Sequence, residues 1–160
     1  MKRRKTRELV IKALFAYEME KGDPFRQLSY IAEDWEMAGF TEGKREAFLS
    51  AIEDEYARRL TAGVLDNKEK LDEMITAYAV DWEISRLGGA ERNILRMSFY
   101  EMLYDEKLAP AIVINEAVDM IKKYGTPEAA RFVNGVLGSY AELLKKEKAA
   151  GDGAAQDAPA

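Results

Sequence analysis

Residues 90–103, with the sequence AERNILRMSFYEML, carry closely spaced apolar side chains and decide the fold. The large apolar residues in this stretch are Ile94, Leu95, Met97, Phe99, Met102 and Leu103. They cover most sides of a helix, and a helix that is apolar on most sides has to be surrounded by other helices. The stretch therefore predicts the central helix in the second half of the protein.

Apolar residues recur at helical spacing on both sides of this central helix, with loop-forming residues between the periodic segments. The pattern predicts an all-α bundle of about seven helices. They are expected ahead of Gly22, at about 25–37, between Thr41 and Asp66, over Leu71–Tyr78, from Ala90, from Pro110, and from Pro127 to about Leu144.

A strand competes with a helix at residues 109–114, because three β-branched residues follow one another there. Pro110 suits the first position of a helix, and apolar residues continue at helical spacing to Ile121. We therefore predict a helix.

The chain is expected to form two helical subdomains, residues 1–66 and 67–148. Residues 149–160 contain no large apolar side chain, and we predict that this tail is disordered.

Two glycines stand three residues apart inside the last predicted helix. Each of Gly135 and Gly138 costs about 1 kcal/mol relative to alanine in a helix interior. This cost predicts a packing reason, such as the close approach of another helix. The neighbouring Asn134 is interpreted as a core amide rather than a ligand-reading residue.

The composition excludes most familiar catalytic sites. The 160 residues include 24 Lys+Arg and 29 Asp+Glu, for a net charge of −5, and there is no cysteine and no histidine. Disulfides, thiolate metal sites, cysteine nucleophiles and histidine bases are therefore absent. Acidic pairs such as Glu101 with Asp105, or the run at 53–55, are interpreted as solvated helix surface. We expect a protein that works by binding, with no metal and no cofactor.

No apolar run approaches the roughly 18 residues that a membrane span needs, and we expect a cytoplasmic protein.

The acidic net charge conceals a basic arm, which we define as residues 1–12. The arm carries six positive residues and one negative residue, which gives +5 and leaves −10 for the rest of the chain. Cations in the first turn of a helix cost roughly 0.3–1 kcal/mol each, so a polyanion that supplies the missing charge would explain them. A solubilising terminus is the alternative.

Six strings in the chain carry a resemblance to a known family. They are RRKTRELVIKALF at 3–15, LTAGV at 60–64, WEISRL at 82–87, ERNILRMSFYEML at 91–103, PAIVINEAV at 110–118 and GTPEAARFVNGVLG at 125–138. In this order and spacing they resemble the NusB transcription antitermination family over residues 3 to 144.

The resemblance implies a NusB-like helical bundle in two subdomains and a non-enzymatic function. It implies binding to single-stranded boxA RNA of nascent ribosomal and phage transcripts, as a heterodimer with NusE, a small-subunit ribosomal protein. The heterodimer would act on RNA polymerase within an antitermination complex. A homodimer is possible, since relatives differ on this point.

The resemblance also implies two sets of site residues. The RNA-binding set is Lys2, Arg3, Arg4, Lys5, Arg7, Lys122, Lys123, Glu128, Arg131 and Phe132, and the NusE-binding set is Phe15 and Glu91. Glu128 matches an acidic position that limits boxA affinity. Phe132 reads as a core residue from periodicity alone, whereas the resemblance places it on the RNA surface, where it would stack on bases.

Two other functions compete with RNA binding. One is a protein-interaction scaffold in which the basic arm plays no part. The other is a methyltransferase, since NusB-like domains also occur fused to rRNA cytosine methyltransferases. The absence of a cysteine and of room for a catalytic domain excludes that enzyme.

Overall fold

A computed structural model describes residues 3–20, 55–79, 87–105 and 107–157. Within these ranges the chain forms six helices and no strand, which confirms the all-α prediction. The helices are α1 (Arg3–Glu20), α4 (Glu55–Asp66), α5 (Lys68–Tyr78), α6 (Gly89–Tyr104), α7 (Pro110–Tyr124) and α8 (Pro127–Asp157). The helix predicted at 25–37 lies outside the described residues, and the division into subdomains stays a prediction.

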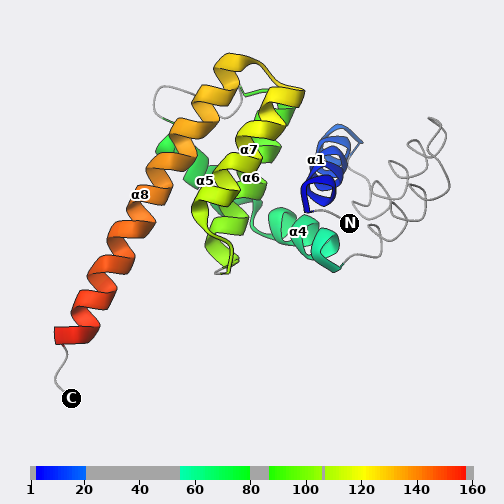
Figure 1. The fold of residues 1–160 in the computed structure, drawn as a ribbon. Helices are drawn as coiled ribbons and strands as arrows, with labels where there is room; N and C mark the ends of the chain where they lie inside the picture. The colour runs from blue at the N-terminus through cyan, green and yellow to red at the C-terminus, as the bar shows by residue number, and fades with distance from the viewer. Residues whose placement is uncertain (1–2, 21–54, 80–86, 106, 158–160) are drawn as a thin grey trace.

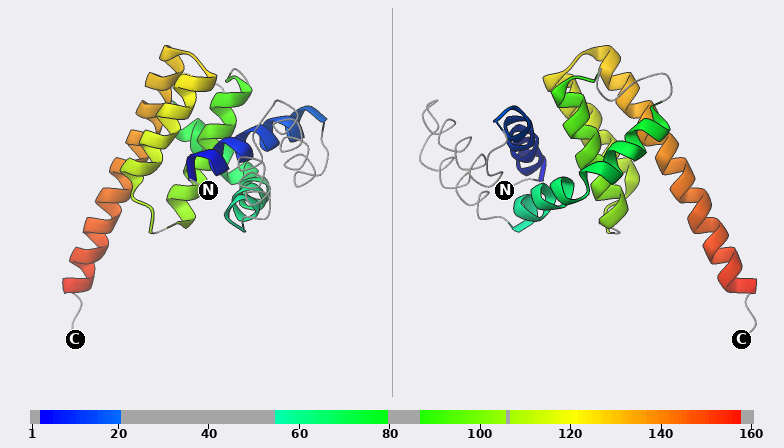
Figure 2. Two further views of the ribbon diagram at one scale, coloured as in Figure 1. Left: turned by 45° about the vertical axis from the view of Figure 1, so that its right-hand side comes forward. Right: turned by 180° about the vertical axis from the view of Figure 1, so that it is seen from behind.

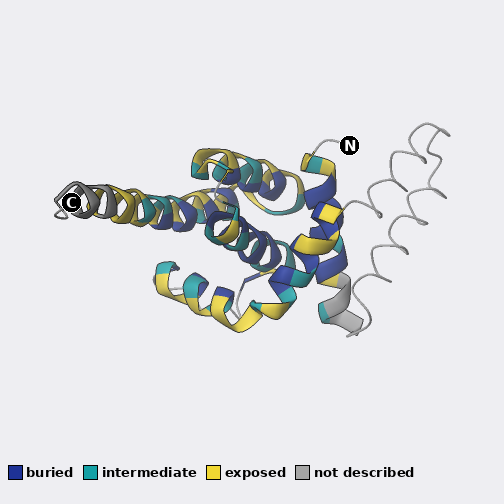
Figure 3. Cartoon of the chain, turned by 90° about the horizontal axis from the view of Figure 1, so that it is seen from below, coloured by how far each residue is buried: buried dark blue, intermediate teal, exposed yellow. Residues whose placement is uncertain are grey.

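Helix α6 is the centre of the fold, as the stretch 90–103 predicts. It contacts α1, α4, α5, α7 and α8, and an unbroken run from Asn93 to Phe99 is buried in it. Figures 1 and 2 show α1 and α4 together on one side of the bundle and α5 and α8 on the other, with α7 alongside α6. In Figure 3 the buried faces of these helices turn toward one another, and the exposed faces turn outward.

The boundaries of α7 and α8 follow from local sequence. Pro110 occupies the start of α7, so the strand alternative at 109–114 is excluded. Helix α7 ends where the Gly125 N–H donates to the Ile121 carbonyl, and the Thr126 hydroxyl then accepts from the Ala129 N–H at 3.1 Å. This cap starts α8 directly behind α7. The two helices therefore pack against each other, as Figure 1 shows.

Helix α8 is longer than predicted. It continues to Asp157, although we predicted disorder for residues 149–160, and Figure 1 shows it projecting beyond the other helices. Alanine, lysine and glutamate, which are strong helix formers, fill much of residues 141–150. They carry the helix past Tyr140, the last buried side chain among residues 127–150.

The glycine prediction for α8 is wrong. A Cβ atom at Gly135 or Gly138 would meet no atom within 4 Å, so no helix approaches either glycine closely. The close approach is instead at Gly63 of α4, where a Cβ atom would lie 2.1 Å from the Tyr100 ring of α6.

A buried ion pair joins α1 to the centre of the fold. The guanidinium of Arg7 donates to both carboxylate oxygens of Glu101 on α6, at 2.7 to 3.0 Å. The two side chains are 4% and 2% exposed. The Tyr56 hydroxyl of α4 donates to the same carboxylate. Burial acts to lower the pKa of Arg7, but the hydrogen bond and the charge of Glu101, with a smaller contribution from Tyr56, together outweigh it. The pKa is therefore raised, and this arginine stays charged.

A second polar cluster holds the other end of α1. Glu18 accepts hydrogen bonds from Arg92, at 2.8 and 3.0 Å, and from Arg96, both on α6. Arg96 also donates to Asp72 of α5 at 2.6 and 3.0 Å. Burial acts to raise the pKa of Glu18, but the bonds from the two arginines outweigh it and hold the pKa at about 2.

Replacement of Glu101 tests the buried pair. Glu101→Gln leaves Arg7 buried with only the Glu116 carboxylate, 3.9 Å away, as an anion, and we expect the free energy of unfolding to fall by about 3–5 kcal/mol. The double variant Arg7→Met/Glu101→Met removes both charges and is expected to lose less. Urea unfolding followed by circular dichroism measures both values. Glu142→Gln, at an exposed position of α8, is the matched control; equal stability of the two glutamine variants would contradict the prediction.

Acid stability tests the Glu18 cluster. Because the folded pKa is about 2 and the ordinary value is 4.5, Glu18 stabilises the fold above about pH 4.5. This contribution is lost as the pH falls from 4.5 toward 2. The urea midpoint should therefore drop more steeply over this range in the wild type than in Glu18→Gln. Parallel curves for the two proteins would refute the role of Glu18.

Candidate nucleic-acid interface

The basic arm is helical from Arg3, and one of its faces lies along α7. Arg4 pairs with Glu116 and donates to Asp119 at 2.9 Å, and one turn later Glu8 pairs with Lys123 at 3.1 Å. The hydrogen bond to Glu116 raises the pKa of Arg4. The acidic body therefore neutralises part of the positive charge that the sequence places in the arm.

Arg7 departs most clearly from the prediction that it binds RNA. Its guanidinium is held by Glu101 inside the protein. A carboxylate oxygen of Glu116 also lies 3.9 Å from this guanidinium. A phosphate cannot reach a side chain that is 4% exposed, so the structure removes Arg7 from the surface set. The sequence interpretation of Glu101 as solvated surface is also wrong, because Glu101 is the buried partner of Arg7.

Two other cations of the arm lie at the surface. Arg3 and Lys5 are exposed, and Lys2 lies outside the described residues. The Arg3 guanidinium carbon is 3.6 Å from the centroid of the Tyr56 ring, a cation–π contact. The α1 residues best placed to meet a phosphate are therefore Arg3, Lys5 and the partly exposed Arg4.

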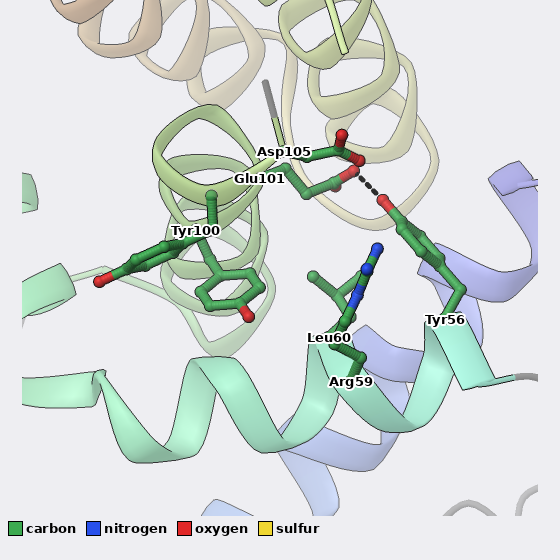
Figure 4. Close-up of a pocket in the computed structure, with 7 residues that line it drawn as sticks. Tyr56, Arg59, Leu60, Tyr100, Glu101 and Asp105 are labelled. Atoms are coloured by element: carbon green, nitrogen blue, oxygen red, sulfur yellow. Dashed lines mark hydrogen bonds between the residues drawn. The ribbon is translucent and has the colours of Figure 1, made fainter. Parts of the chain in front are cut away.

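A small cavity lies between α4 and α6, beside this contact. Figure 4 shows Arg59 and Tyr56 extending from α4 toward Glu101 on α6 and Asp105 directly after it. The Arg59 guanidinium also lies over the Tyr56 ring, 5.3 Å from its centroid. Because the Glu101 carboxylate is occupied by Arg7 and Tyr56, we assign the cavity to the packing of the fold.

The junction of α7 and α8 forms a second basic surface. A groove between the two helices, which we call the α7/α8 groove, is lined by Val118, Lys122, Pro127, Ala130, Arg131 and Asn134. Lys122 and Arg131 are exposed, as predicted for RNA-binding residues. Asn134 is exposed as well, so its interpretation as a core amide is wrong.

Two further members of the RNA-binding set lie beside this groove. Glu128 is exposed in the first turn of α8, where the helix dipole favours an acidic side chain. Phe132 is half-buried and packs against the core, so its position lies between the two readings of the sequence. Phe132 is not among the residues that line the groove.

The two residues predicted to bind a protein partner meet at the start of α6. Phe15 is 45% exposed, and its ring lies so close to Gly89 that a Cβ atom there would be 2.2 Å from it. The Glu91 carboxylate covers Gly88 in the same way, at 2.2 Å, and lies 3.2 Å from a Cβ position at Gly125. Phe15 and Glu91 thus lie against two consecutive glycines, Gly89 and Gly88. The sequence marks the two glycines only as a loop.

The described residues offer no site for a metal ion, since no group of three or more acidic, histidine or cysteine side chains is placed to hold one. None of their helices is long and apolar enough to cross a membrane.

Comparisons with known proteins agree on one family. The NusB family model matches residues 4–142. A transcription antitermination protein NusB from Bacillus pumilus is 34% identical over 147 residues, which is 92% of this chain and 100% of that protein. A structure of NusB from T. maritima superimposes with a TM-score of 0.72 at 32% identity and covers 89% of this chain and 92% of its own.

A solved complex also contains a chain of this fold. It is described as antitermination factors NusB and NusE in complex with dsRNA, and its matching chain is 27% identical with a TM-score of 0.69. The match covers 88% of this chain and 96% of that one. Sequence, family model and fold therefore agree, and the chain belongs to the NusB family.

Proposed function

We propose that this protein is a transcription antitermination factor that binds single-stranded boxA RNA of nascent rRNA transcripts. It acts as a heterodimer with NusE and suppresses termination by RNA polymerase. The observation that carries the proposal is its similarity, over 88% of its length, to a chain from a complex of NusB and NusE with double-stranded RNA.

The arrangement of cations supports an RNA surface along α7. Helix α1 contacts one side of α7 through Arg4 and Glu8, and α8 packs on α7 as well. Five exposed cations therefore belong to α7 itself or to the parts of α1 and α8 that adjoin it. They are Arg3, Lys5, Lys122, Lys123 and Arg131.

The bonds of these cations separate two roles. Arg4 and Lys123 are paired with carboxylates, so an RNA phosphate has to compete with an existing ion pair. Lys122 and Arg131 form no hydrogen bond or ion pair with any residue that the structure describes. We therefore assign the larger electrostatic contribution to the α7/α8 side of the surface.

A protein-interaction scaffold without sequence-specific RNA binding is the second candidate. The neutralised charge of Arg4 and Arg7 favours it, because these arginines already have partners. Preference for boxA RNA over a scrambled single strand separates the two functions, since a scaffold would bind both RNAs alike.

The cations of the groove are tested by Lys122→Ala/Arg131→Ala. We expect boxA affinity to fall by about 10-fold near 0.15 M salt, because two phosphate contacts are lost. The slope of log K against log salt should become shallower by about 1.4, or roughly 0.7 for each contact with a single strand. Fluorescence anisotropy of labelled boxA, scrambled and duplex RNA over a salt series gives both quantities.

Lys145→Ala/Lys146→Ala is the matched control, since it removes the same charge from exposed positions further along α8. If the two double variants behave alike, the effect is one of net charge, and the assigned surface is wrong.

The partner face is tested by Phe15→Ala. An exposed aromatic ring fixed against a glycine is a rigid contact, and truncation of such an anchor costs about 2 kcal/mol, or roughly 30-fold in affinity. Isothermal titration with NusE measures the change. Ile112→Ala, which removes a side chain that is 49% exposed on α7, should leave NusE affinity unchanged. Equal losses in the two variants would speak against this face.

A further inference from the structure

The α7/α8 groove combines apolar surface with two positively charged side chains and one amide. Val118, Pro127 and Ala130 supply the apolar surface, and Lys122, Arg131 and Asn134 supply the polar groups. No carboxylate is among the lining residues. The groove therefore suits a ligand that has an apolar ring face and a negative charge.

Most arginines that face the rest of the fold are matched by acids. Arg4, Arg7, Arg92 and Arg96 each pair with one or two carboxylates. Lys122 and Arg131 stand on the two walls of the groove without such partners in the described part of the chain. Two unmatched cations on facing helices favour an anion from outside the protein.

Asn134 adds a hydrogen-bonding group to this site. Its amide has no partner among the described side chains and backbone groups, and it lies one helical turn beyond Arg131. Next to it, Gly135 and Gly138 leave the surface of α8 open, with nothing within 4 Å of either Cβ position. Asparagine and glycine are both poorer helix formers than alanine, so helix stability does not explain them here.

The space in the groove is sufficient for a nucleotide. The groove has a volume of about 670 Å³, which lies within the roughly 300–1,000 Å³ of typical small-molecule sites.

We propose that the α7/α8 groove binds one unstacked nucleobase of the RNA, with its flanking phosphates on Lys122 and Arg131 and its edge read by the Asn134 amide. This inference rests on the proposed function. The amide offers one donor and one acceptor side by side, which matches the N6 donor and N7 acceptor of adenine. Bases in single-stranded RNA can be splayed out and read on such edges. Adenine is therefore the expected base.

The experiment is an abasic scan of boxA RNA against the wild type and Asn134→Ala. Each nucleotide in turn is replaced by an abasic site, and the dissociation constant is measured by fluorescence anisotropy. At the nucleotide that occupies the groove, the abasic substitution should weaken RNA binding by the wild type. The same substitution should change the affinity of Asn134→Ala little, because this variant has already lost the contact to the base. RNAs with each of the four bases at that position are then compared. The wild type should prefer adenine by about 5- to 150-fold, and the variant should bind all four alike.

Asn115→Ala is the matched control, since Asn115 is an exposed asparagine on α7 outside the groove. It should keep the wild-type preference, and thermal melts should show that both variants are folded. The salt slope of Asn134→Ala should equal that of the wild type, because no cation is removed.

Two failures can be told apart. If the wild type binds boxA RNA but Asn134→Ala keeps its full base preference at every position, the inference is overturned and the proposed function stands. If the wild type does not prefer boxA RNA over a scrambled strand, the proposed function fails and the inference fails with it.

Discussion

The buried ion pair between Arg7 and Glu101 is the constraint on which the position of α1 depends. Two charges inside a protein have to be fully compensated, so α1 can lie against α6 only where these two side chains meet. That register places Arg4 beside Glu116, nearly one helical turn before Arg7, and Glu8 beside Lys123, directly after Arg7. At the far end of α1, Glu18 reaches the arginines of α6. The two polar clusters together fix α1 along its length.

This constraint divides the basic arm into residues with different tasks. Arg7 holds the fold, Arg4 joins α1 to α7, and Arg3 and Lys5 remain at the surface. A sum of charges over residues 1–12 treats all of them as available and so overstates the positive field of the arm. The unmatched positive charge of the described surface includes the junction of α7 and α8, more than 100 residues later in the chain.

Local patterns in the sequence predict the helices and their ends well. The density of apolar residues at 90–103 identifies the central helix, and Pro110 and Gly125 mark the limits of α7. These features depend on neighbours in the chain, which periodicity and propensity describe. The resemblance to NusB proteins is confirmed at the level of the family, and the assigned roles of individual residues stay predictions.

Contacts between helices are what the sequence does not reveal. Glu101 reads as solvated surface because its partner Arg7 lies 94 residues earlier. Gly135 and Gly138 read as packing positions because propensity gives the cost of a glycine and not the face on which it lies. The Phe15 ring lies against Gly89, a close approach that neither residue signals alone. Such pairings require the relative placement of helices, for which a single sequence contains no periodic signal.

The length of α8 has a consequence for how the protein occupies space. At 1.5 Å for each residue, its 31 residues extend about 46 Å, whereas a compact domain of this size has a diameter of only about 30 to 40 Å. The distance along the helix from Asn134 to Asp157 is about 35 Å. The helix therefore places Asp157 well away from the α7/α8 groove. A bulky group joined to this end of the chain would leave the groove accessible.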